Sequence, residues 1–62
     1  MKTLTPYQQG VYVNLSHFAR DDWKGEAKRY DLVAYCMGYY GSITAEIYEV
    51  INLLFEQGIV EP

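Results

Sequence analysis

A stripe of large aliphatic side chains in the last third of the chain constrains the fold more than any other feature of the sequence. Ser42 to Thr44 offers an N-cap before this stripe, and Gly58 suits the left-handed position that follows a helix end. We therefore expect an amphipathic helix over about 43–57, whose apolar face other parts of the chain must cover. The stripe follows the three- and four-residue spacing of an α-helix, at Ile43, Ile47, Val50, Ile51 and Leu54.

The beginning of the chain predicts another helix, over about 6–19. Thr5, Pro6 and Gln8 form the pattern of a capping box with proline at the first helical position. Gly10 and nearby β-branched valines weaken this pattern, so a short strand over 10–14 stays open as an alternative. Helical spacing places one set of apolar residues on a common face, namely Tyr7, Val11, Leu15 and Phe18, and leaves Gln8, Gln9, Asn14 and Ser16 elsewhere.

The middle of the chain predicts a third helix, over about 25–38. Asp21 and Asp22 favour a break and the N-cap of this helix, which ends near Gly38 to Gly41. Together the three helices predict an all-α, compact, winged-helix-like three-helix domain over 1–62, with an extended tail at Ile59 and Val60. The expected core face is Ala27, Tyr30, Val33, Ala34 and Met37, while Leu32, Tyr35, Cys36 and Tyr39 make the other side apolar as well.

The small size of the chain limits what else it can contain. A chain of 62 residues supports one thin hydrophobic core. Cys36 is the only cysteine and His17 the only histidine, so we expect no internal disulfide, no metal site and no cofactor, with Cys36 acting as a small hydrophobe. The sequence contains no signal peptide and no apolar run of membrane-spanning length, so we expect a soluble cytoplasmic protein.

The second half of the chain resembles the winged helix-turn-helix family. The resemblance rests on Asp31-Leu32-Val33-Ala34-Tyr35, on Ile43-Thr44-Ala45-Glu46-Ile47 and on Leu54-Phe55-Glu56-Gln57-Gly58-Ile59-Val60. It implies that the helix from Thr44 to Gln57 occupies the recognition position, and that the protein acts as a dimeric DNA-binding transcription regulator. A full wing is not expected, because the sequence ends at Pro62.

Charge is unevenly distributed along the chain. Residues 1–30 hold five bases and three acids, a net charge of +2, whereas residues 31–62 hold five acids and no base, a net charge of −5. The helix in the recognition position is therefore acidic, which disfavours DNA because phosphate binding depends on cations. The residues with nucleic-acid character are Arg20, Trp23, Lys24, Lys28 and Arg29, although neighbouring acids also allow a solvated, self-paired connection.

The abundance of tyrosine suggests a surface that binds protein. Five of the seven tyrosines lie between residues 30 and 48, and tyrosine is enriched at protein interfaces. The alternative is that these rings pack around the core with their hydroxyls in water. His17 beside Asp21 and Asp22 is not accompanied by a nucleophile motif, so we expect no enzyme. The predicted function is a protein-interaction module, a small bacterial or phage regulator or inhibitor, which binds a protein partner or a second copy through Tyr35, Tyr39, Tyr40, Tyr48, Glu49, Asn52, Phe55 and Glu56.

Overall fold

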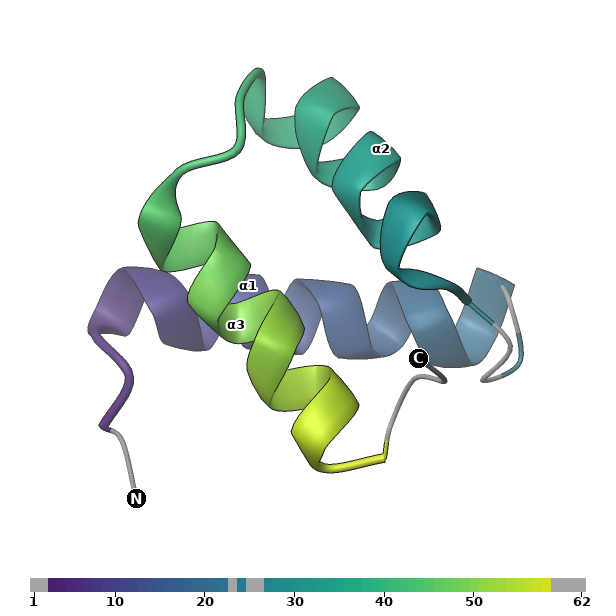
Figure 1. Cartoon of the computed structure of the whole chain (residues 1–62), viewed down its shortest axis with the longest axis horizontal. Helices are drawn as coiled ribbons and strands as arrows, with labels where there is room; N and C mark the ends of the chain where they lie inside the picture. Colours follow the sequence, from purple (N-terminus) through teal and green to yellow (C-terminus); the bar gives the residue numbers. More distant parts are fainter. Residues whose placement is uncertain (1–2, 23, 25–26, 59–62) are drawn as a thin grey trace.

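The protein is an all-α domain of three helices, here described from a computed structural model over residues 3–22, 24 and 27–58. Helix α1 spans Pro6–His17 and continues directly into η1, a π-helical turn over Phe18–Asp22. Helix α2 spans Arg29–Tyr40 and helix α3 spans Ala45–Glu56, and no strand occurs in the described ranges. Figure 1 shows α3 crossing in front of α1, with α2 above α1 and joined to α3 by the turn at the top of the view.

The start of α1 confirms the predicted capping box. The Gln8 amide donates to Thr5 Oγ1 over 3.1 Å, and the Thr5 amide donates to Gln8 Oε1 over the same distance. Residues 10–14 are helical, so the strand alternative for them is wrong. After His17 the chain keeps its helical course through Asp22 as η1 instead of breaking at the two aspartates.

Helix α2 begins later than the sequence predicts. Its N-cap is Lys28, whose amide donates to the Asp31 carboxylate over 2.8 Å. The predicted N-cap at Asp21 or Asp22 is wrong, because η1 takes up both aspartates. The helix ends at Tyr40, within the predicted range of Gly38 to Gly41, and Gly41 follows it with a left-handed φ of 84°. The connection to α3 is therefore a short turn over 41–44.

The core face of α2 is not the predicted one. Leu32 and Cys36 are fully buried, whereas Tyr30 is 72% exposed, Met37 is 50% exposed and Ala34 is also on the surface. Helix α2 carries apolar side chains around most of its circumference, so hydrophobic periodicity alone does not choose between its faces. The positions of α1 and α3 decide which face packs, and they leave Tyr30, Ala34 and Met37 pointing outward, while Val33 is half-buried against the core.

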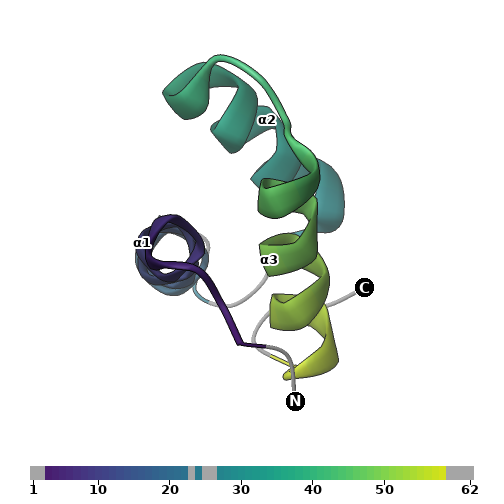
Figure 2. The ribbon, with the colours of Figure 1, turned by 90° about the vertical axis from the view of Figure 1, so that its left-hand side faces the viewer.

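Helix α3 follows the prediction. Thr44 caps it by accepting the Ile47 amide over 3.3 Å, and Gly58 takes the expected left-handed conformation with φ of 74°. The predicted extended tail at Ile59 and Val60 lies outside the described residues. Figure 2 looks along α1 and shows α3 and α2 beside it. The fully buried side chains that join the three helices are Val11, Leu15, Ala19, Ala27, Leu32, Cys36, Ile47, Val50, Ile51 and Leu54.

Two polar side chains of α1 are buried against the rest of the fold, contrary to the expectation that they lie away from the core. Gln8 is 3% exposed, and its Nε2 donates to the Glu46 carbonyl oxygen over 3.1 Å and to Glu49 Oε2 over 2.8 Å. Ser16 is buried too, and its Oγ has no hydrogen-bond partner within the described part of the chain. At the other end of α3, Tyr12 donates its hydroxyl to Gln57 Oε1 over 2.5 Å. Helices α1 and α3 are thus joined by polar contacts at both ends of α3.

Candidate functional site

Aromatic rings from α1, η1 and α2 meet along the seam between these segments, in a set that we call the aromatic row. Phe18 stacks on Tyr35 with ring centroids 4.1 Å apart, and Tyr35 stacks on Tyr39 at 5.7 Å. Tyr40 contacts Tyr39 at 4.8 Å and Tyr7 at 6.2 Å, both edge to face. Such geometries are the favoured ones for aromatic pairs. The row therefore holds α2 against α1 without filling the space between them completely.

Asn14 is the polar centre of this seam. Its side-chain Oδ1 accepts the Tyr35 hydroxyl over 2.8 Å, and its Nδ2 donates to the Tyr40 hydroxyl oxygen over 3.0 Å. Burial raises the pKa of Tyr35, an effect that the hydrogen bond to Asn14 partly opposes. Tyr35 is therefore a neutral donor at ordinary pH, and Asn14 fixes two α2 tyrosines at once.

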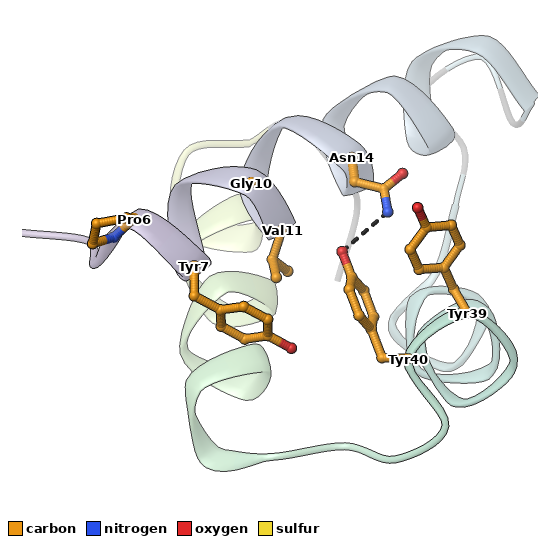
Figure 3. Close-up of a pocket in the computed structure, with 7 residues that line it drawn as sticks. All are labelled: Pro6, Tyr7, Gly10, Val11, Asn14, Tyr39 and Tyr40. Carbon is orange, nitrogen blue, oxygen red and sulfur yellow. Dashed lines mark hydrogen bonds between the residues drawn. The ribbon is translucent and has the colours of Figure 1, made fainter.

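A cavity opens beside Asn14 and is here called the tyrosine cavity. Its volume is about 370 Å³, and Tyr40 stands in it between Tyr7 of α1 and Tyr39 of α2 (Figure 3). A Cβ built on Gly10 would meet nothing within 4 Å, so the glycine leaves this part of the wall open. The lining residues are Pro6, Tyr7, Gly10, Val11, Asn14, Tyr39 and Tyr40.

A second cavity lies on the other side of Asn14 and is here called the acidic cavity. It measures about 210 Å³ and contains both exposed aspartates of η1, Asp21 and Asp22. His17 Nδ1 lies 3.8 Å from Asp21 Oδ2, with both side chains largely in solvent. Phe18 and Tyr35 form its aromatic wall. The two cavities adjoin, because Asn14 lines both of them, and we call the pair, aromatic at one end and acidic at the other, the furrow.

A third cavity lies apart from the furrow, on the acidic flank of α3. It measures about 200 Å³ and is lined by Leu4, Glu49, Asn52, Leu53 and Glu56. On the neighbouring flank of α3, Arg29 Nη1 donates to Asn52 Oδ1 over 2.7 Å, and its guanidinium carbon lies 4.5 Å from the Phe55 ring centroid. Arg29 is therefore used to fasten α2 to α3.

The residues predicted to form one protein-binding surface are distributed over separate places in the fold. Tyr35, Tyr39 and Tyr40 line the furrow, Asn52 and Phe55 hold Arg29, and Glu49 and Glu56 border the third cavity, while Tyr48 is exposed on α3. The furrow also uses side chains that the sequence did not single out as site residues. These side chains are Tyr7, Asn14 and Phe18. The apolar stripe of the first predicted helix contained Tyr7 and Phe18, whereas no sequence pattern indicated Asn14.

The predicted basic residues do not form a compact site. Arg20, Lys24 and Lys28 are exposed around η1 and the start of α2, while Arg29 is held by α3. Trp23, the aromatic member of this set, lies outside the described residues. Three of the basic side chains therefore lie around η1 and the start of α2, whereas Arg29 contacts α3.

Cys36 behaves as the sequence predicts for a small hydrophobe. Its side chain is fully buried, and burial raises the pKa of its thiol to about 11. Within residues 3–22, 24 and 27–58, no three His, Cys, Asp or Glu side chains gather closely enough to hold a metal ion. No helix in those same ranges has both the length and the apolar character that a membrane span requires.

Comparison with protein-family models, with curated proteins and with solved structures found no match to this chain.

Proposed function

We propose that this protein is a non-enzymatic interaction module, a small regulator or inhibitor that binds an extended segment of a partner protein in the furrow. One observation carries the proposal: the tyrosine cavity and the acidic cavity adjoin at Asn14 and run along the same helix. Two neighbouring cavities of different chemistry fit two different side chains of one peptide better than they fit a single compact ligand.

The tyrosine cavity suits a proline or a flat apolar side chain. Rings of Tyr7, Tyr39 and Tyr40 offer faces and edges for such a group, and Tyr39 keeps 65% of its surface exposed. Aromatic-lined grooves are the usual means of recognising proline-rich, extended segments. The open position at Gly10 gives the peptide room beside α1.

The acidic cavity suits a lysine or arginine of the same peptide. Asp21 and Asp22 are exposed there, and the whole chain carries a net charge of −3. An exposed ion pair contributes about 0.2–1 kcal/mol, so this end supplies orientation and a faster association rate more than it supplies affinity. The favoured partner segment is thus extended, with an apolar or proline anchor followed by a basic residue.

Selection from a displayed library of random peptides tests this proposal. Peptides enriched on the protein should share a proline or aromatic anchor and a nearby base. Gly10→Leu places a side chain in the tyrosine cavity and should weaken a selected peptide by about tenfold or more, which corresponds to about 1.4 kcal/mol. Replacing Asp21 and Asp22 by asparagine should weaken it severalfold, most clearly at low salt.

Val13→Leu is the matched control for the cavity-filling variant. Val13 lies on the outer face of α1 with 53% of its surface exposed, and it does not line the furrow. The control should bind the selected peptides as the unmodified protein does. Equal binding by the Gly10→Leu variant, or enrichment of peptides without the expected anchor and base, would show that the furrow is not the binding site.

DNA binding is a second candidate, favoured by the succession of α2, a short turn and α3. The resemblance of the sequence to the winged helix-turn-helix family implies the same function. However, α3 carries Glu46, Glu49 and Glu56 and no base, which opposes entry into a groove between phosphates. Retardation of DNA at low salt, abolished by replacing Lys24, Lys28 and Arg29, would support this candidate. Absence of retardation at micromolar protein would exclude it.

A further inference from the structure

The residues of α1 and η1 that line the furrow lie on one face of a continuous helical segment. Tyr7, Gly10 and Asn14 line the tyrosine cavity, and Asn14, His17 and Asp21 line the acidic cavity. Their numbers increase by three or four at each step, which is the spacing of neighbours on one side of a helix. The distance between two parts of the furrow therefore follows from the number of residues between them.

The two ends of the furrow are separated by about 16 Å along this segment, at the helical rise of 1.5 Å per residue. Gly10 leaves the wall of the tyrosine cavity open, because a Cβ built there would meet nothing within 4 Å. Asp21, at the acidic end, follows eleven residues later. A segment that uses both ends must place its apolar anchor and its positive charge this far apart.

A segment in the polyproline II conformation covers this distance in three residues. The conformation advances about 3.1 Å per residue, so three residues span about 9 Å. The aliphatic stem of a lysine or arginine carries the charge about 6 Å further. The sum is about 15 Å, close to the separation of Gly10 and Asp21. Because the conformation has three residues per turn, side chains three residues apart also point to the same side.

A segment in the β conformation fits the same separation less well. Its side chains alternate, so residues two or four apart point to the same side. At about 3.3 Å per residue, and with the same aliphatic stem, these spacings reach about 13 Å and about 19 Å. Both values differ from about 16 Å by more than the polyproline II value does. Aromatic-lined grooves also favour polyproline II segments, because that conformation is already formed before binding.

We propose that the furrow binds a polyproline II segment in which a proline and a lysine or arginine lie three residues apart. This conformation and spacing extend the proposed function, on which the inference rests. Charge complementarity identifies the base, because Asp21 and Asp22 are exposed and no lysine or arginine is among the described residues that line the two cavities. The proline lies in the tyrosine cavity, against the rings of Tyr7, Tyr39 and Tyr40.

A series of short peptides, titrated into the isotope-labelled protein and followed by NMR, tests the spacing. Each peptide contains one proline and one lysine among alanines and serines, with the lysine two, three or four residues before or after the proline. In one of the two orders, spacing three should bind about twofold to fivefold more tightly than the other spacings, which is the contribution of an exposed ion pair. The amide signals of Gly10, Asn14 and Asp21 should move during the titration, because these residues line the furrow.

Removal of the acids tests where the lysine binds. Asp21→Asn combined with Asp22→Asn should abolish the preference for spacing three and make the peptides equal. Glu46→Gln combined with Glu56→Gln is the matched control, because both are exposed acids of α3 that line neither cavity of the furrow. This control removes the same amount of charge and should keep the preference.

Proline at both positions between the anchor and the lysine tests the conformation. Proline fixes φ close to the polyproline II value, so the spacing-three peptide should bind at least as tightly after this change. A matched peptide with glycine at both positions should bind more weakly, because more backbone freedom is lost on binding.

Equal affinities at spacings two, three and four, or a best spacing other than three in both orders, would overturn the inference. A loss of binding in the peptide with prolines at the intervening positions would overturn it too. In each of these cases the signals of the furrow still move with some peptides, so the proposed function stands. If no peptide moves the signals of the furrow, the proposed function fails and the inference fails with it.

Discussion

Two polar side chains of α1, Gln8 and Ser16, are buried, and they differ in whether their hydrogen bonds are made. Gln8 uses its amide fully: the oxygen accepts the Thr5 amide, and the nitrogen donates to two groups of α3. Ser16 Oγ has no partner among the described residues. A buried polar group stabilises a fold only when its hydrogen bonds are made, and it destabilises the fold when they are not. The two positions therefore have opposite effects on the free energy of unfolding.

Truncating these two side chains to alanine should change stability in opposite directions. Gln8→Ala removes the contacts to α3 and half of the capping box, and should destabilise the fold by about 2–3 kcal/mol. Ser16→Ala removes an unpaired hydroxyl in favour of the best helix former, and should stabilise it by about 1 kcal/mol. Urea denaturation of both variants beside the unmodified protein measures the two changes. A loss of stability in Ser16→Ala would mean that the hydroxyl has a partner in solution.

At the scale of single residues, the sequence predicted the roles that local spacing defines. Thr5, Gln8 and Thr44 were assigned to helix starts correctly, because a cap and its amide lie within three residues. The burial of Gln8 was not predictable in the same way. Its second role depends on Glu46 and Glu49, which lie 38 and 41 residues further along the chain.

Glycine has different roles at two positions of the chain, one at the end of a helix and one inside a helix. Gly41 ends α2 with φ of 84°, a conformation that other residues adopt only with strain. Gly10 lies inside α1, where its small size leaves the tyrosine cavity open but its backbone freedom weakens the helix. Neither position would place a Cβ within 4 Å of a neighbour, so the backbone alone decides the effect of a methyl group.

Alanine at these two glycines should therefore give opposite results. Gly41→Ala should destabilise the fold by about 1 kcal/mol, because it forces a left-handed alanine. Gly10→Ala should stabilise it by about 0.5–1 kcal/mol, because alanine is the better residue in a helix interior. Thermal unfolding followed by circular dichroism at low protein concentration measures both shifts. If Gly41→Ala proves as stable as Gly10→Ala, the end of α2 does not require the left-handed conformation.

At the scale of elements, the sequence predicted α3 well and α2 poorly. Helix α3 is apolar on one side only, so its spacing alone defines the face that packs. Helix α2 has apolar residues on most sides, and its buried pair, Leu32 and Cys36, belonged to the side considered secondary. Its start was also missed, because the π-helical turn at η1 extends α1 through the aspartates that looked like an N-cap.

The molecule as a whole has a single described core, and the Cys36 thiol lies inside it. Burial raises the pKa of this thiol from 9.0 to about 11. The thiol of the unfolded chain therefore ionises at a lower pH than that of the folded chain. Its contribution to stability is complete below about pH 9 and is lost as the pH rises from about 9 to about 11.

The free energy of unfolding should accordingly fall across this alkaline range, by an amount on the order of 2 kcal/mol from Cys36. The raised pKa of Tyr35 acts in the same direction at still higher pH. Cys36→Ala is less stable at neutral pH, since it leaves a small cavity, but it should lose less stability between pH 9 and pH 11. Urea denaturation at several pH values compares the two slopes. Parallel slopes would mean that the thiol is not held protonated by the fold.

The sequence predicted some of the residues that line the furrow, but it did not predict how they come together. The surplus of tyrosine indicated an interface, and three of those tyrosines do line the furrow. The other side of the furrow is formed by side chains of α1 and η1. Which of them face the tyrosines depends on how α2 packs across these segments. Tyr40 and Tyr35 reach Asn14 from 26 and 21 residues away, and no spacing within one helix indicates such a contact.

The two hydrogen bonds of Asn14 also give the furrow a direction. The Tyr40 hydroxyl oxygen accepts a hydrogen bond from the Asn14 amide, so its own O–H remains available to donate to a ligand in the tyrosine cavity. The Tyr35 hydroxyl donates its hydrogen bond to Asn14, so towards the acidic cavity its oxygen can only accept a hydrogen bond. One end of the furrow therefore asks for an acceptor such as a peptide carbonyl, and the other for a donor such as an ammonium or guanidinium group. A single neutral amide thereby sets which end of the furrow takes a hydrogen-bond acceptor and which end takes a donor.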